Sequence, residues 1–168
     1  MKSEAIIDLS LLDLDNPIAD IEAIRKLNPQ RHEMEQLTAI LYEDVSRYAC
    51  AALKEITDQE FWVRGHMPGL PLMPGVVQCE VAAQLSSFHV QRHNLMQAEM
   101  IGFGGLDKVR FRGAIVPGQR LVMAGKLIKL RPKRMCICSF QGFVDGGLVL
   151  EGEIKGIAIP VDALRKTQ

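Results

Sequence analysis

The sequence predicts an α+β fold in which an antiparallel sheet wraps around one long, buried helix. Residues 76–93 follow Pro74, contain no Gly or Pro, and are apolar on nearly all sides over their first four turns. A helix of that composition is normally buried. Four strand-like segments, each ending at a turn with Pro or Gly, come after it: residues 101–116, 121–130, 135–144 and 148–159. Their short connections favour an antiparallel meander packed on the helix.

The segments ahead of this helix predict an arm, a short helix and two strands. Residues 1–15 are acidic and leucine-rich without a clear period, so we expect an arm or an added edge element before a single domain over residues 16–168. Asn16 and Pro17 favour a helix start, and isoleucines at helical spacing predict a short amphipathic helix through about Leu27. Residues 37–56 favour two strands, although an alanine-rich stretch leaves a helix as the alternative.

The composition excludes several classes of function. The 168 residues are 48% apolar, and 20 Lys and Arg residues balance 20 Asp and Glu residues, so no global charge attracts nucleic acid. No apolar run approaches the ~20 residues of a transmembrane helix, and the acidic start differs from a secretory signal. We therefore expect a cytoplasmic protein with reduced cysteines and neither a membrane nor nucleic acid as partner.

A histidine in a stiff loop, followed by a carboxylate in the predicted helix, points to acid/base chemistry. His66 lies in a loop rich in Pro and Gly, and Glu80 lies among mostly apolar neighbours, with Gln84 four residues on and so on the same helical face. Burying an unpaired carboxylate costs several kcal/mol and favours its neutral form, which can act as a general acid. A histidine can act as the base near the same pH.

The start of the helix adds a place for negative charge. The amides of Gly75, Val76 and Val77 lie in the first turn, where they lack partners inside the helix and where the helix dipole favours an anion. Base, acid and amide donors together suit removal of a proton α to a carbonyl, with loss of a leaving group from the β-carbon. Each feature alone is more often structural, and the spacing does not establish that His66 and Glu80 meet.

Residues 61–84 closely resemble the signature of the bacterial β-hydroxyacyl-[acyl-carrier-protein] dehydratases of type II fatty acid synthesis. That family has Gly-His-Phe-Pro, then Pro-x-x-Pro-Gly-Val, then Glu-x-x-Ala-Gln on its central helix. The matching residues are Phe61, Gly65, His66, Pro68, Pro71, Pro74, Gly75, Val76, Glu80, Ala83 and Gln84. Residues 103–118 are similar to the family's following strand and turn, and the resemblance extends over roughly residues 18–160.

The resemblance implies a hotdog fold, which is an antiparallel sheet wrapped around one long central helix. It also implies a homodimer with active sites at the interface, and leaves open a hexamer built as a trimer of dimers. The implied substrate is a (3R)-3-hydroxyacyl chain carried on the phosphopantetheine of acyl carrier protein, and no metal or organic cofactor is implied. The chain resembles the branch of the family that does not isomerise its product. The isomerising branch has Asp at the position of Glu80 and Cys at the position of Gly65.

The resemblance also implies roles for single residues. His66 of one subunit would remove the α-proton, Glu80 of the other would protonate the departing hydroxyl, and the Gly75 amide would hold the thioester oxygen. The remaining substrate contacts implied are Met67, Pro74, Val76 and Gln84.

The chain departs from the family's pattern mostly outside this motif. The replaced positions are Gln30, Thr38, Ala39, Met67, Ile101 and Gly102, and the last two stand where the family has aromatic residues that help gate the acyl tunnel. Residues 1–15 have no counterpart. The acyl chain length and the pathway are therefore left open.

Basic residues form two candidate docking groups for an acidic carrier protein. Lys108, Arg110 and Arg112 alternate, which predicts one basic strand face, and Arg131, Lys133 and Arg134 surround a turn. A solvated surface is an equally good interpretation of both groups. His89 and His93 have a spacing that suits a metal ion, but no third ligand is evident, so we expect no metal site.

Two other functions compete with dehydration. A hotdog thioesterase uses a carboxylate to help water attack the acyl carbonyl, but thioesterases of this fold generally lack the His66 loop. A non-catalytic hotdog protein that binds an acyl chain or a carrier protein has no reason to keep both His66 and Glu80. Dehydration is therefore the preferred hypothesis.

Overall fold

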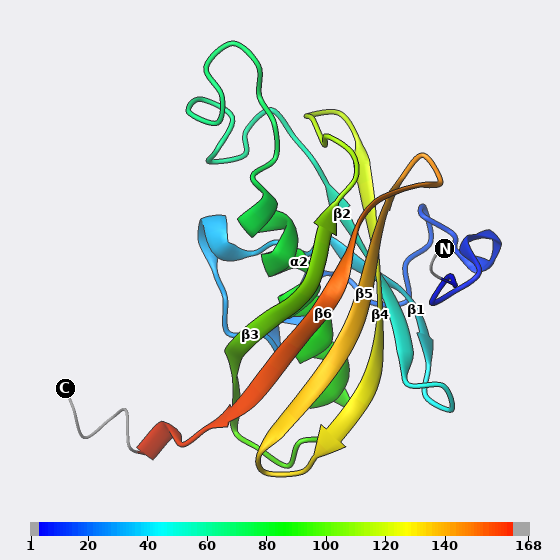
Figure 1. Cartoon of the computed structure of the whole chain (residues 1–168), viewed down its shortest axis with the longest axis vertical. Helices are drawn as coiled ribbons and strands as arrows, with labels where there is room; N and C mark the ends of the chain where they lie inside the picture. Colours follow the sequence, from blue (N-terminus) through cyan, green and yellow to red (C-terminus); the bar gives the residue numbers. More distant parts are fainter. Residues whose placement is uncertain (1–3, 163–168) are drawn as a thin grey trace.

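The computed structural model describes residues 4–162, and their main elements are one six-stranded antiparallel sheet and one long helix (Figure 1). The strands are β1 (Ala39–Asp44), β2 (Ala49–Glu55), β3 (Met100–Phe111), β4 (Arg120–Arg131), β5 (Met135–Val144) and β6 (Gly147–Ile159). The helices are α1 (Ile21–Arg25) and α2 (Gly75–Arg92), with two 3₁₀ turns, η1 (Leu9–Leu11) and η2 (His32–Met34). Within residues 4–162, no helix is long and apolar enough to cross a membrane. The predicted hotdog fold is confirmed.

The order of the strands corrects the expected meander. In the sheet they run β1-β2-β4-β5-β6-β3, so only β4, β5 and β6 follow one another as a meander. The strand β3 precedes β4 in the chain but pairs with β6 instead, because residues 112–119 lead the chain back across the sheet to β4. As a result, β3 is an edge strand with one side unpaired.

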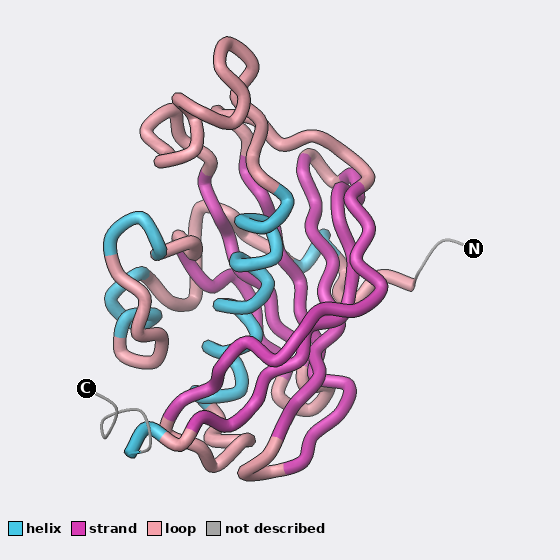
Figure 2. The backbone as a smooth tube through the Cα atoms, turned by 60° about the vertical axis from the view of Figure 1, so that its left-hand side comes forward, coloured by secondary structure: helices cyan, strands magenta, loops and turns pink. Residues whose placement is uncertain are grey.

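The helix α2 lies along the concave face of the curved sheet, where it forms the core (Figure 2). Val81, Leu85 and Phe88 have no exposed surface and pack against apolar side chains from the strands. The helix has no polar face, which explains why it is buried rather than amphipathic. Val76 is the exception to the predicted all-round burial, because it lies in the first turn and is 79% exposed.

The N-terminal segment covers the other face of the sheet (Figure 1). Ile6 and Ile7 are buried against Leu41, Leu53 and other apolar side chains that point away from α2. The Ile6 amide donates a hydrogen bond of 2.8 Å to the buried side chain of Gln141. Residues 4–15 pair with no strand, so they pack on the sheet without extending its edge, and residues 1–3 of the predicted arm lie outside the described residues.

The N-terminal helix is shorter than predicted. It begins at Ile21, after Asp20, whose side chain accepts a hydrogen bond from the Ala23 amide. The expected start at Asn16 and Pro17 is wrong, because the backbone of Ile18 and Ala19 pairs with Ile40 of β1. That pairing requires extended backbone ahead of Asp20. The two strands predicted within residues 37–56 are confirmed as β1 and β2.

The packing of α2 predicts which leucine matters for stability. We expect Leu85→Ala to lower the free energy of unfolding by about 2–5 kcal/mol, because it leaves a cavity under the helix. Leu11→Ala is the matched control, since Leu11 is 61% exposed, and it should change the free energy by less than about 0.5 kcal/mol. Urea denaturation of both variants measures the difference, and equal costs would contradict the placement of α2 in the core.

Candidate active site

His66 is held in one orientation by its own loop. Its amide donates to the carbonyl of Trp62 at 2.8 Å, and its carbonyl accepts from the Leu72 amide at 2.8 Å. The ring atom Nδ1 lies 2.8 Å from the Leu72 carbonyl oxygen, which can only accept, so Nδ1 carries the proton. In the neutral imidazole, the other ring nitrogen, Nε2, then has the lone pair that a general base requires.

Glu80 is oriented by Gln84. The Gln84 Nε2 donates to Glu80 Oε1 at 2.8 Å and to the Met34 carbonyl at 2.6 Å, while its Oε1 accepts from the Gln36 amide at 2.9 Å. Gln84 is buried and both ends of its amide are engaged, so its orientation is settled. Glu80 itself is half-buried. The helix thus offers its carboxylate in a fixed position, with Oε2 left for another partner.

The amides at the start of α2 are available to a ligand. The Val77 and Gln78 amides donate to the Pro74 carbonyl at 3.0 and 3.1 Å, whereas the Gly75 and Val76 amides have no acceptor within residues 4–162. Gly75 is also tightly placed, because a Cβ atom there would lie 2.8 Å from Cζ of Phe111. Two donors at a helix N-terminus suit a developing negative charge.

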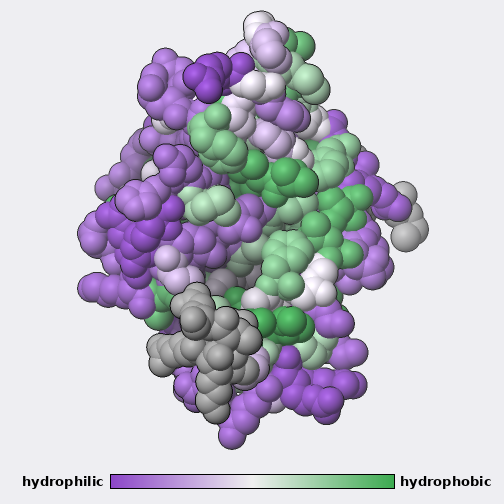
Figure 3. Space-filling model, turned by 90° about the vertical axis from the view of Figure 1, so that its left-hand side faces the viewer, coloured by the Kyte–Doolittle hydropathy of each residue, from purple (hydrophilic) through white to green (hydrophobic). Residues whose placement is uncertain are grey.

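A cavity of about 320 Å³ begins at Glu80 and runs between α2 and the start of β3. Ser86, Ser87 and Gln91 line it from the helix, and Ile101 and Phe103 line it from β3. Cys136 and Cys138 line it from β5 and are both buried. On the α2 and β3 side of the molecule, apolar residues gather around a hollow (Figure 3). A mostly apolar cavity with a carboxylate at one end suits an acyl chain with a polar reacting end.

His66 and Glu80 are not joined within one chain. No hydrogen bond connects them in the described part of the chain, and His66 does not line the cavity that contains Glu80. The loop that carries His66 extends beyond the N-terminal end of α2 (Figure 1). Met67 and Leu70 of this loop are 50% and 60% exposed. Within the described residues, His66 and Glu80 are therefore held by separate segments of the chain.

The strand β3 is bulged where the predicted basic residues lie. The register shifts between Asp107 and Arg110, and Lys108 has a φ of 54°, so Lys108, Arg110 and Arg112 do not alternate along a regular strand. Two of the three side chains are paired with acids of β6, Lys108 with Glu153 and Arg112 with Glu151. All three nevertheless line one shallow groove on the outer face. Arg131, Lys133 and Arg134 are exposed at the β4–β5 turn.

The structure brings together a cluster that sequence reasoning missed. Glu43 of β1 lies against His89 and His93 of α2, although the sequence offered no third partner for the two histidines. Burial would raise the pKa of Glu43, but hydrogen bonds from His89 and His93 and the charge of Arg92 together lower it. The signal was absent from the sequence because β1 and the end of α2 are more than 40 residues apart.

Comparison with known proteins supplies the family. A family model described as a FabA-like domain matches residues 28–153. The 3-hydroxyacyl-[acyl-carrier-protein] dehydratase FabZ of Streptococcus gordonii is 33% identical over 135 residues, which cover 80% of this chain and 94% of that protein.

Solved structures share the fold at low identity. The dehydratase heterocomplex ApeI:P of Xenorhabdus doucetiae matches with a TM-score of 0.70 and 15% identity, over 86% of this chain and 95% of that one. A hypothetical thioesterase of Streptococcus pneumoniae, solved with coenzyme A, has a TM-score of 0.54 and 11% identity, over 71% and 84%. The fold alone therefore spans more than one activity, and it is the family model and the dehydratase sequence that place this chain: it belongs to the FabA-like family of hotdog proteins.

Proposed function

We propose that this protein dehydrates (3R)-3-hydroxyacyl chains carried by acyl carrier protein, giving trans-2-enoyl thioesters for fatty acid or related acyl chain synthesis. The observation that carries the proposal is the geometry of the acid/base pair. His66 is held through Nδ1 by the Leu72 carbonyl, which leaves Nε2 for the substrate, and Glu80 is held by Gln84 at one end of a mostly apolar cavity. Curated relatives at 33% identity carry the corresponding name.

Each group has one role in the proposed reaction. His66 Nε2 takes the α-proton of the thioester, and the charge that develops on the thioester oxygen is accepted by the Gly75 amide, with the Val76 amide beside it. Glu80, which takes part in this step in its protonated form, gives its proton to the β-hydroxyl, which leaves as water while the α,β double bond forms. The reaction ends with His66 protonated and Glu80 ionised, so one proton transfer between them restores the enzyme. Met67 and Pro74 would border the substrate.

A homodimer completes the site in this proposal. The outer side of β3 is unpaired along an edge strand of 12 residues, and Phe103, Leu106 and Phe111 on it are exposed. Unpaired apolar edges invite pairing with another strand. Two β3 strands side by side would bury them, cover Val76, and bring His66 of one subunit to Glu80 of its partner. A hexamer of three such dimers stays an expectation from the resemblance.

Docking of the carrier protein is part of the same proposal. The six basic residues are expected to contribute unequally to the attraction for this acidic partner. Lys108 and Arg112 are neutralised by Glu153 and Glu151, which weakens their attraction for an acidic partner. Arg110 has no ion pair in the described range, and neither have Arg131, Lys133 and Arg134. These four residues therefore carry most of the proposed attraction for the acidic carrier protein. We place the reaction in the cytoplasm.

Substitution of the acid and the base tests the chemistry. His66→Asn and Glu80→Gln should each lower kcat/KM for hydration of a crotonyl thioester, or a longer homologue, by roughly 10²-fold or more, the usual scale for acid/base catalysis. Loss of enoyl absorbance measures the rate. The matched controls are His32→Asn and Glu33→Gln on the exposed 3₁₀ turn, which should keep wild-type rates. Full activity in either active-site variant would refute the mechanism.

Mixed dimers test where the site lies. His66→Asn and Glu80→Gln subunits, refolded or expressed together in equal amounts, should regain about a quarter of wild-type activity, because half the dimers are mixed and each mixed dimer has one intact site. The two variants alone give the baseline. If both groups act within one subunit, mixing restores nothing, and the shared-site proposal fails even if each variant alone is inactive.

A further inference from the structure

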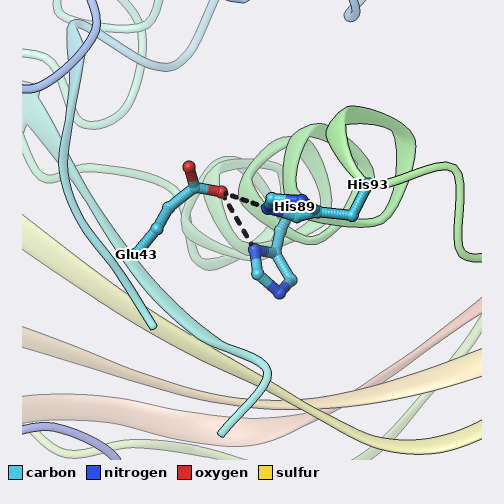
Figure 4. Close-up of side chains that lie close together, drawn as sticks. All are labelled: Glu43, His89 and His93. Carbon is cyan, nitrogen blue, oxygen red and sulfur yellow. Dashed lines mark hydrogen bonds and ion pairs between the residues drawn. The ribbon is translucent and has the colours of Figure 1, made fainter. Parts of the chain in front are cut away.

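Glu43, His89 and His93 place three metal-ligand atoms around one point. Glu43 Oε1 lies 3.1 Å from His89 Nδ1 and 3.1 Å from His93 Nε2. These three atoms all lie within 4.8 Å of one another. Figure 4 shows both imidazole rings turned toward the same carboxylate oxygen. His89 lies in the last turn of α2, His93 caps the C-terminus of the helix, and the glutamate faces them from β1.

We propose that these three residues form a binding site for a divalent transition-metal ion of the Zn²⁺ type. Two imidazoles and one carboxylate are a donor set that suits Zn²⁺, whereas Ca²⁺ and Mg²⁺ take oxygen ligands. Ligands about 2.0–2.1 Å from a tetrahedral ion lie about 3.3 Å apart. The separations of 3.1 Å from Glu43 Oε1 need to widen by a few tenths of an ångström, and the two histidine nitrogens, which lie within 4.8 Å of one another, need to take up a similar separation.

The neighbouring residues orient the proposed ligand atoms and leave the side of the site near His93 open to water. Arg92 Nε holds the second oxygen of Glu43 at 2.9 Å, so Oε1 faces the histidines. The side chains of Glu43 and His89 are 8% and 2% exposed, whereas that of His93 is 23% exposed. Water can therefore supply the fourth ligand beside His93. Arg92 also brings a positive charge near the ion, so we expect moderate rather than very tight binding.

Binding would exchange hydrogen bonds for coordinate bonds without net loss of contacts. In the metal-free state Nδ1 of His89 and Nε2 of His93 donate their protons to Glu43. In the bound state each ring is neutral with its proton on the other nitrogen, and the freed lone pair binds the ion. Within the described residues His89 Nε2 has no hydrogen-bond partner, so the proton that it carries in the bound state is unpaired, which lowers the affinity.

The role of this ion would be structural. His89 is nine residues beyond Glu80 on the same helix, which corresponds to about 14 Å along its axis. The three residues do not line the cavity that contains Glu80. An ion here would tie the C-terminal part of α2 to β1, which stabilises the wall that faces the acyl cavity without taking part in dehydration.

Calorimetric titration with Zn²⁺ tests the proposal on protein freed of metal with a chelator and of any affinity tag. We expect one Zn²⁺ per chain, and an unfolding midpoint that rises with Zn²⁺ concentration because the ion binds the folded state. His93→Asn should weaken binding by at least about tenfold and reduce the rise in the midpoint. His32→Asn is the matched control, since His32 is an exposed histidine outside the cluster, and it should bind like the wild type.

Two outcomes would overturn the site. Either no saturable Zn²⁺ binding, or equal binding by the wild type and His93→Asn, would show that the cluster is only a hydrogen-bonded contact. Glu43→Gln gives a second test, and if that variant does not fold, His93→Asn still decides because its side chain is partly exposed. Dehydration by chelator-treated protein separates this proposal from the catalytic one, since loss of Zn²⁺ should leave the initial rate at low temperature unchanged.

Discussion

The burial of α2 inside the sheet is the constraint on which the rest of the structure depends. A helix with no polar face must be covered on every side, and the curved sheet covers it. Any polar side chain on such a helix then needs a partner from another element, since an unpaired buried polar group is costly. Gln84 forms hydrogen bonds with the backbone of Met34 and Gln36, and His89 forms one with the side chain of Glu43. The candidate sites on α2 are the places where this requirement is met.

The proposed acid and base, Glu80 and His66, are held in place by different segments of the chain. Glu80 is fixed from within, through Gln84 and the segment after α1, whereas His66 is fixed by the backbone of its own loop. In the described part of the chain, none of these hydrogen bonds links Glu80 to His66. Both groups are held in place within one chain, so the proposed dimer would need only to bring them together through the unpaired edge of β3.

Much of this arrangement could be predicted from local pattern, and the failures have a common cause. The limits of α2, β5 and β6 follow from apolar runs and Pro or Gly turns, which are local signals. The place of β3 beside β6, the extended backbone at Ile18, and the pairing of Glu43 with His89 all depend on contacts between segments far apart in the chain. No periodicity encodes such contacts. The family motif predicted the roles of His66 and Glu80 because it summarises a tertiary arrangement that local pattern cannot express.

Three of the six positions that depart from the family pattern lie together in the structure. Gln30, Ile101 and Gly102 line the same cavity as Glu80. Thr38 lies outside that cavity, where its hydroxyl accepts a hydrogen bond from the Glu55 amide and its own amide bonds Leu53, so that replacement concerns the pairing of β1 with β2. The proposed acid, base and amide donors keep the family's residues, while part of the wall of the proposed acyl cavity does not. This distribution favours an unchanged reaction on an acyl chain whose shape differs from that of the family's usual substrate.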